Sequence, residues 1–203
     1  MISSPKLILA SASNARTMLL NRIGYQPSEI VPADLDETEK PGELPHHLAK
    51  RLAKEKAEKI AASFPNDIVI AADTVAAAGR LILPKALSED DAAFCLGKLS
   101  GRRHKVFTGI CTIYNSRILV RLGATTVKFK RLSKIEKELY IASKQWQNKA
   151  GGYAIQGLAA AFVEWISGSD ISNVTGLSVY DTYIMLSTLG LQPNLDLLTK
   201  ENN

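Results

Sequence analysis

The stretch LILASASNAR, residues 7–16, joins an apolar segment typical of a buried strand to a polar segment that opens a helix. Two serines, an asparagine and an arginine stand at the junction, and the helix-like pattern continues until Gly24 would end it. Such a junction gathers unpaired backbone N–H groups, hydroxyls and the positive end of a helix dipole, which suits a phosphate. Taken alone, the stretch favours the plainer interpretation, in which Ser13 or Asn14 only caps the helix.

Helix and strand patterns alternate through the first half of the chain. Segment 45–64 has the spacing of an amphipathic helix, with a predicted buried stripe of Leu48, Leu52, Ala53, Ala57 and Ile60. The apolar run 67–75 predicts a buried strand, and 104–115 with 117–131 predict a long hairpin that turns around the sequence NS. Helices among early strands, followed by a hairpin, favour an α/β or α+β fold with a mixed, twisted sheet.

The remaining elements are marked by capping residues and glycines. Two serines are each followed three residues later by an acidic residue, the spacing of a capping box that starts a helix: Ser88 with Asp91, and Ser133 with Glu136. A further strand is expected over 157–166 and a last helix over 176–189. We expect a single domain over residues 1–203, of which 191–203 form a loose tail.

Composition and charge limit the classes of function. The chain has 203 residues, of which 46% are hydrophobic, and this is enough for a sizeable core. A net charge of +5 and a pI near 9.2 favour an anionic partner, whether nucleotide, nucleic acid or membrane. No segment has the roughly 18 apolar residues that span a bilayer, and no secretory signal is evident. Because Cys95 and Cys111 have no paired spacing, we expect buried thiols in a cytoplasmic, soluble protein.

Two acidic segments are candidates for metal or acid-base chemistry. Asp73 follows the buried run IVIAA, where a carboxylate could bind a divalent cation or activate water; a strand-end aspartate held by a turn is an equally good interpretation. The loop that follows Ala33 offers oxygen ligands for Mg²⁺ at Asp34, Asp36, Glu37 and Glu39. Most acidic loops are only solvated, so one of these four is expected to matter.

Basic and amide side chains are harder to interpret from sequence. Lys56, Lys85 and the run RRHK, residues 102–105, would ordinarily form a solvated basic face. The loop GGYAIQG, residues 151–157, permits close backbone approach, and Gln156 can both donate and accept, as base recognition requires. Neither a P-loop nor a G-x-G-x-x-G motif occurs, and the three histidines have no spacing typical of a zinc site.

Taken in order, short blocks of this sequence resemble the Maf family of nucleoside triphosphate pyrophosphatases, which is related in fold to the inosine triphosphatases. The blocks are LILASAS followed by Arg16, DLDET, RLAKEKA, AADTV, ILPK, LSGRRHKVFTG, KAGGYAIQGLAA and SNVTGLSVYDTY. They extend from about Leu7 to Gly190. The resemblance implies an elongated, twisted mixed β-sheet with flanking helices and two lobes around a cleft.

The resemblance also implies an activity. Family members hydrolyse a nucleoside triphosphate between its α and β phosphates, with a divalent cation, Mg²⁺ or Mn²⁺. By resemblance Asp73 is the general base, and Glu37 and Asp73 hold the cation. The residues implied to surround the triphosphate are Ser11, Ser13, Arg16, Lys56 and Lys85, and those implied to affect the choice of base are Thr74 and Gln156. Many members pair as dimers, which leaves a homodimer open.

The form GGYAIQG resembles the branch of the family that acts on dTTP and UTP rather than the branch that acts on 7-methyl-GTP. The first loop departs from the family pattern S-x-S-P-R-R, because Asn14 and Ala15 replace its proline and first arginine. The usual G-K-P is Pro84-Lys85-Ala86 here. Loss of one phosphate-binding arginine predicts a slower or differently selective enzyme.

Two other classes of function stay open at this point. The degenerate first loop would allow a regulatory protein, linked as the family is to septum formation and cell division, that binds nucleotide without turnover. Retention of Glu37, Asp73 and both lysines argues against it, since a pure binder has less use for a metal-binding base. Nucleic-acid binding ranks last, because aromatic residues make up only 6% of the chain and none alternates with the lysines.

Overall fold

The computed structural model describes residues 5–200 and contains one mixed sheet. The strand order is β2-β1-β3-β5-β6-β7, with β4 paired to β3 at one end. Strand β1 is parallel to both β2 and β3, and the other pairings are antiparallel. The strands are β1 (Leu7–Leu9), β2 (Glu29–Ile30), β3 (Ile68–Ala78), β4 (Leu81–Leu83), β5 (Arg103–Tyr114), β6 (Arg117–Phe129) and β7 (Val163–Gly168).

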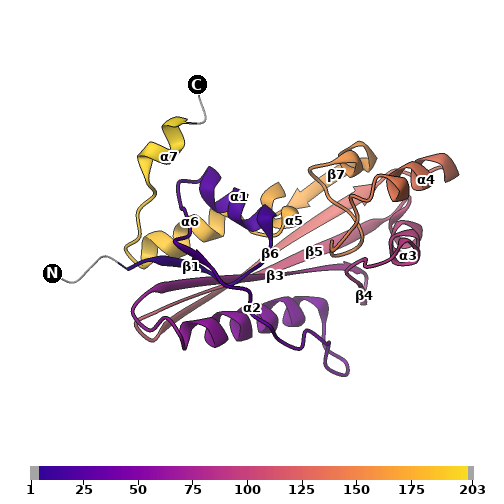
Figure 1. The fold of residues 1–203 in the computed structure, drawn as a ribbon. Helices are drawn as coiled ribbons and strands as arrows, with labels where there is room; N and C mark the ends of the chain where they lie inside the picture. The colour runs from indigo at the N-terminus through magenta and orange to yellow at the C-terminus, as the bar shows by residue number, and fades with distance from the viewer. Residues whose placement is uncertain (1–4, 201–203) are drawn as a thin grey trace.

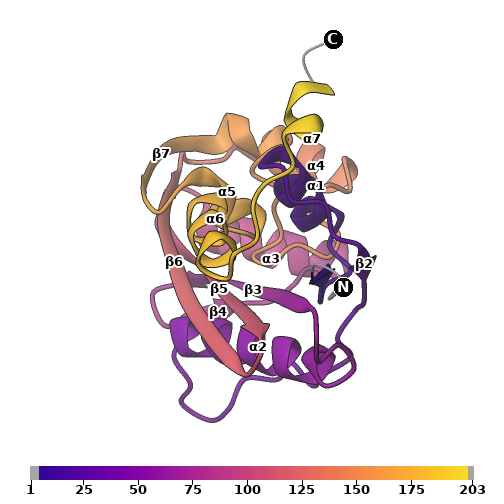
Figure 2. The same cartoon turned by 90° about the vertical axis from the view of Figure 1, so that its left-hand side faces the viewer.

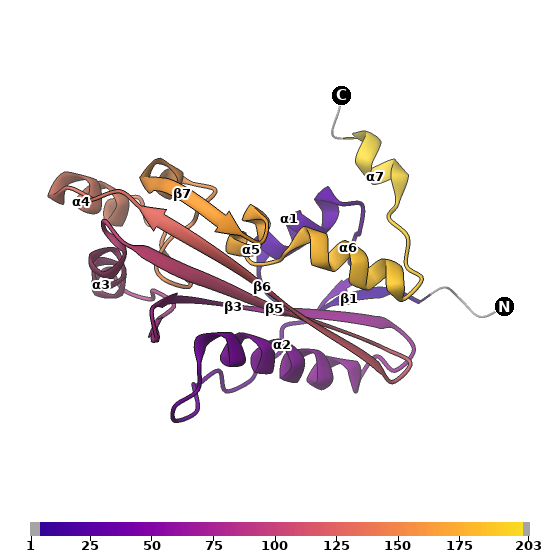
Figure 3. The ribbon, with the colours of Figure 1, turned by 180° about the vertical axis from the view of Figure 1, so that it is seen from behind.

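Helices cover both faces of this elongated sheet. Figure 1 shows α2 on one face, with α1, α5 and α6 on the other and α3 and α4 at one end, and Figure 3 shows the same layers from behind. Seen from the end, α2 and α6 lie on opposite sides of the strands (Figure 2). The helices are α1 (Asn14–Arg22), α2 (Pro45–Ala61), α3 (Glu89–Leu99), α4 (Lys134–Ala142), α5 (Ile171–Thr175), α6 (Val179–Thr188) and α7 (Leu195–Lys200).

Local signals in the sequence explain most of these elements. The predicted stripe of α2 is buried throughout, and both predicted capping boxes are present at the starts of α3 and α4. The long hairpin β5-β6 turns at Asn115 and Ser116, whose φ angles of 47° and 62° are those that a two-residue hairpin turn requires. The expected mixed sheet with flanking helices is confirmed.

The second half departs from the sequence-based expectations in three places. The segment predicted as a strand over 157–166 begins instead as a 3₁₀-helix, Leu158–Phe162, and β7 follows it. The short helix α5 precedes the expected last helix. Within the expected tail, α7 forms after Asn194, whose N–H donates to the carbonyl of Gly24. Asn194 and Gly24 are far apart in sequence, so no local pattern predicts their contact. Residues 201–203 of the expected tail lie outside the described residues.

Close packing of α2 against the sheet sets the position of the site. A Cβ atom added at Gly109 of β5 would lie 2.2 Å from the carbonyl oxygen of Ala49, so only glycine allows this approach. Ala53 and Ala57 continue the contact with Ala71 of β3. The buried face of α2 therefore lies directly beside the part of β3 that carries Asp73 and Thr74.

Two other sequence expectations concern the cysteines and membranes. Cys95 and Cys111 are both buried free thiols, and burial raises the pKa of Cys95 to about 11 and that of Cys111 to about 12. Among the residues that the structure describes, no helix is both long and apolar enough to cross a membrane.

Candidate active site

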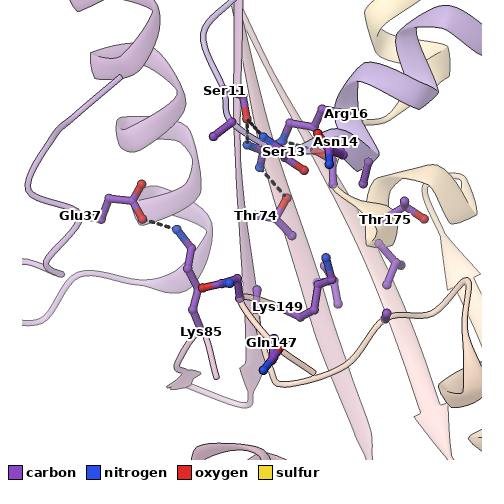
Figure 4. Close-up of a pocket in the computed structure, with 18 of the residues that line it drawn as sticks. Ser11, Ser13, Asn14, Arg16, Glu37, Thr74, Lys85, Gln147, Lys149 and Thr175 are labelled. Carbon is purple, nitrogen blue, oxygen red and sulfur yellow. Dashed lines mark hydrogen bonds and ion pairs between the residues drawn. The ribbon is translucent and has the colours of Figure 1, made fainter. Parts of the chain in front are cut away.

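A cavity of about 590 Å³ opens between the β1-α1 junction, α2 and the loop before the 3₁₀-helix. Figure 4 shows the labelled side chains around it, with Ser11 and Arg16 on one side and Lys149 and Gln147 on another. Every predicted site residue except Asp73 lines the cavity: Ser11, Ser13, Arg16, Glu37, Lys56, Thr74, Lys85 and Gln156. Asp73 contacts the lining through Lys56. Residues from distant parts of the sequence thus meet in one polar cavity.

The β1-α1 junction leaves the N-terminus of α1 without a side-chain cap. Ser13 holds the N-cap position, but its side chain accepts no hydrogen bond from the helix, and the first turn has no acidic residue. The hydroxyl of Ser11 instead accepts from the N–H of Ser13 at 3.2 Å. Ser13 is therefore the N-cap residue, as the plainer interpretation predicts, but its side chain does not cap the helix. The end of this nine-residue helix faces the cavity with its dipole uncompensated.

Arg16 connects this junction to two other segments of the chain. Its guanidinium donates to Ser11 Oγ at 2.8 Å, to Thr74 Oγ1 at 3.4 Å and to the carbonyl oxygen of Gly176 at 2.9 Å. Burial lowers the pKa of Arg16, while the carboxylates of Asp73 and Glu37 act in the opposite direction. The side chain of Arg16 is thus positioned by neutral oxygens and keeps its charge for the cavity.

Lys56 joins the two predicted metal-binding carboxylates. Its Nζ lies 2.5 Å from Asp73 Oδ1 and 2.5 Å from Glu37 Oε1. Lys56 is 6% exposed and Asp73 is 3% exposed, whereas Glu37 reaches the group from the loop before α2. Lys85 pairs with the other oxygen of Glu37. Partial burial of Glu37 acts to raise its pKa, but hydrogen bonds from Lys56 and Lys85 outweigh it and lower the pKa to about 2.

The donor set fits a hard divalent cation that shares its coordination with a substrate. Glu37 and Asp73 come from different elements, yet an oxygen of each lies within 2.5 Å of the same ammonium nitrogen. Mg²⁺ is commonly bound by one or two carboxylates together with phosphate and water oxygens. No group of three His, Cys, Asp or Glu side chains able to hold a metal occurs within residues 5–200, so an all-protein cage is not formed there.

A model of the family described as Maf-like protein matches residues 6–189. The chain belongs to the Maf family. Relatives are named dTTP/UTP pyrophosphatase: one from Caulobacter vibrioides is 50% identical over 194 residues, covering 95% of this chain and 100% of the relative. One from Paramagnetospirillum magneticum is 52% identical over 188 residues, covering 92% of this chain and 98% of the relative.

A solved structure supports the fold of this Maf chain. The structure of a HAM1 protein from Coxiella burnetii aligns with a TM-score of 0.51 over 92% of this chain and 100% of that one. The two sequences are 16% identical, so the likeness concerns the fold. The elongated mixed sheet expected from the resemblance is therefore shared with a second family.

Sequence reasoning missed part of the cavity of this Maf chain. Gln147, Asn148 and Lys149 line it, as does Thr175. The first three lie just before the loop GGYAIQG, separated from it by Ala150, and Lys149 begins the block KAGGYAIQG. They lie in a loop without regular secondary structure, and no hydrophobic periodicity in the sequence predicts the path of such a loop.

The basic run 102–105 is not uniformly solvated as predicted. His104 is 2% exposed, and its Nε2 shares a hydrogen bond of 2.8 Å with the hydroxyl of Tyr153, which lines the cavity. Burial lowers the pKa of His104 to about 4. The alternation of β5 explains the error, because Arg103 and Lys105 are exposed while His104 points to the other face. His104 therefore supports the cavity wall from inside the core.

Proposed function

We propose that this chain hydrolyses dTTP and UTP to the nucleoside monophosphate and pyrophosphate. The observation that carries the proposal is the group formed by Asp73, Lys56 and Glu37 at the edge of a cavity that is also lined by an uncapped helix start. Anionic phosphates suit the helix start and the cations, and a buried carboxylate suits activation of water. Relatives about half identical in sequence are named for this reaction.

In the proposed complex the triphosphate contacts the β1-α1 junction and the lysines. The residues assigned to it are Ser11, Ser13, Arg16, Lys56 and Lys85, all of which line the cavity. Hydroxyls and backbone N–H groups donate to phosphate oxygens, and the cations offset their charge. Glu37 and Asp73 would hold Mg²⁺ or Mn²⁺ with the phosphates, and the cation would neutralise charge on the polyphosphate.

Asp73 is assigned as the general base. Its carboxylate accepts a proton from a water molecule, whose oxygen attacks the α phosphorus; the bond to the bridging oxygen breaks, and pyrophosphate leaves. Lys56, which contacts Asp73 Oδ1 at 2.5 Å, fixes the direction of this carboxylate. The base accepts the proton at the edge of the cavity, close to the assigned phosphate site.

Thr74 and Gln156 are assigned to the nucleobase. Gln156 is an exposed residue of the cavity wall, and the hydroxyl of Thr74 is positioned by Arg16 and Thr108. Thymine and uracil both present an O4 acceptor and an N3–H donor, to which one amide can pair. We therefore expect weak discrimination between dTTP and UTP.

The replacement of the first loop arginine by Ala15 favours a second candidate function, nucleotide binding with little turnover and a regulatory role. Ala15 lines the cavity without a charge. The catalytic function is favoured over binding alone because the chain retains the whole group of Glu37, Lys56, Asp73 and Lys85. As further proposals, the chain acts in the cytoplasm as a single Maf-like domain, pairs as a homodimer and does not bind nucleic acid.

The first experiment measures pyrophosphate release from dTTP, UTP, CTP and 7-methyl-GTP with Mg²⁺ or Mn²⁺. We expect release from dTTP and UTP, and a loss of about 10²–10⁴-fold in kcat for Asp73→Asn. Asp90→Asn, a change at an exposed carboxylate of α3, is the matched control and should behave as the unmodified protein. Nucleotide binding without release from any of the four would favour the regulatory candidate instead.

A further inference from the structure

Four cationic side chains line the cavity, and their partners differ. Lys56 contacts both Glu37 and Asp73, and Lys85 contacts Glu37. Arg16 is held by three neutral oxygens. Lys149 is the fourth, and within residues 5–200 its ammonium group makes neither an ion pair nor a hydrogen bond. The two carboxylates are therefore shared by two lysines and leave Lys149 uncompensated.

The backbone of Lys149 is fixed although its side chain is not. Its N–H donates to the carbonyl of Trp146 at 3.0 Å, and its carbonyl accepts from Ala86 at 3.1 Å and from Gly152 at 2.9 Å. The next residue, Ala150, forms a β-bridge with Lys85. The segment that carries Lys149 is thus joined to the segment that carries Lys85, and the two lysines enter the cavity from adjoining chain segments.

Figure 4 shows Lys149 near the centre of the cavity wall, across from the junction that carries Ser11 and Arg16. Lys149 is partly buried, and an ammonium group can only donate hydrogen bonds. A cation in the wall of a cavity, without a carboxylate in contact, is free to pair with a bound anion. A polyphosphate has enough charge to engage the helix start, Arg16 and Lys149 together, whereas a nucleobase offers a neutral edge.

We propose that Lys149 binds the polyphosphate of the substrate, opposite the β1-α1 junction, and contributes affinity through phosphate charge and not through the base. The inference rests on the proposed function, because that function places a triphosphate in this cavity. It assigns to Lys149 part of the cationic contact that an arginine at position 15 would otherwise make. The contribution should therefore grow with the number of phosphates in the ligand.

The test is calorimetric binding of inorganic pyrophosphate, inorganic tripolyphosphate and thymidine, without metal. For Lys149→Gln we expect pyrophosphate and tripolyphosphate affinities to fall about ten- to hundred-fold, with thymidine affinity unchanged. Lys149→Arg should keep most of the affinity. Lys134→Gln is the matched control, because that lysine is 88% exposed on α4, and it should bind as the unmodified protein. Thermal unfolding of each variant establishes that it is folded.

Each other outcome contradicts the inference. Unchanged pyrophosphate affinity in Lys149→Gln would show that Lys149 does not contact the phosphates. An equal loss for thymidine and pyrophosphate would show that the change distorts the cavity or removes a base contact. Failure of the proposed function is distinguishable: absence of dTTP and UTP hydrolysis by the unmodified protein would end that proposal, while a selective loss of pyrophosphate affinity would still establish Lys149 as an anion-binding residue.

Discussion

The Nζ atom of Lys56 lies 2.5 Å from Oδ1 of Asp73, and both residues are almost fully buried. Glu37 approaches the same ammonium group from the loop before α2 at 2.5 Å. One buried cation therefore separates two carboxylates that would otherwise repel each other at close range. Both the stability of the site and its proposed chemistry therefore depend on Lys56.

Removal of the ammonium should destabilise the protein. In Lys56→Met, Asp73 is left buried without its counter-ion, and we expect a loss of about 3–5 kcal/mol in the free energy of unfolding. Lys56→Met combined with Asp73→Asn should lose less than the sum of the single changes, because no buried charge then lacks a partner. Urea denaturation of the two single variants and the double variant measures this coupling. Additive losses would mean that the contact contributes no net stability.

The same substitution should change the response to a divalent cation. In Lys56→Met the oxygens of Glu37 and Asp73 no longer share an ammonium, so a cation can neutralise both. We expect Mn²⁺, without nucleotide, to raise the melting temperature of Lys56→Met by more than that of the unmodified protein. Lys56→Met with Glu37→Gln should lose that extra gain. An equal shift in all three proteins would argue against metal binding at these carboxylates.

Buried His104 should make stability depend on pH in a defined window. Burial lowers the pKa of His104 to about 4 from its ordinary value of 6.5, so below pH 6.5 the unfolded chain binds a proton that the folded chain does not. Stability should therefore fall as pH drops from 6.5 to 4, by on the order of 3 kcal/mol from this group.

Denaturation curves of His104→Phe provide the comparison. Phenylalanine can occupy the aromatic surroundings of Phe129 and Tyr153 but cannot be protonated, so its stability should change less between pH 6.5 and 4. The loss of the hydrogen bond to Tyr153 should lower stability by a similar amount at every pH in this window. Parallel pH profiles for the two proteins would contradict this assignment.

Restoring a charge at position 15 should increase activity. Ala15 lies in the first turn of α1 and lines the cavity, so an arginine there can donate to phosphate oxygens. For Ala15→Arg we expect kcat/KM for dTTP to rise about ten-fold or more. Met18→Arg, on the same helix at a residue that is 71% exposed, controls for added charge and should leave kcat/KM unchanged. No gain in Ala15→Arg would show that the first arginine is not needed here.

Periodic and local signals made much of the fold predictable. The apolar stripe of α2, the two capping boxes and the turn at Asn115 and Ser116 each depend on residues within one element, and the structure confirms them. Helix α7 was not predicted, since its support comes from Gly24, far away in sequence. Local patterns do not encode such contacts.

In the candidate site, too, some residues could be predicted from the sequence and others could not. Predictions of its residues came largely from the order of the family blocks. The structure brings all of them except Asp73 to the wall of one cavity, and Asp73 contacts that wall through Lys56. Periodicity placed the lysines of α2 on the exposed side, yet Lys56 lies on the buried face because two carboxylates meet it there. Lys149 was missed because the course of its loop is set by bonds to Trp146 and Ala86.

The bond from Arg16 to the carbonyl of Gly176 spans 160 residues. During synthesis the β1-α1 junction leaves the ribosome early, but the acceptor that orients its arginine emerges only after most of the chain has been made. The partner of Thr108, the carbonyl of Asn173, arrives equally late. A nascent chain that has already formed the hairpin β5-β6 therefore still lacks the acceptor that orients Arg16. We expect nucleotide to stabilise only the nearly complete polypeptide.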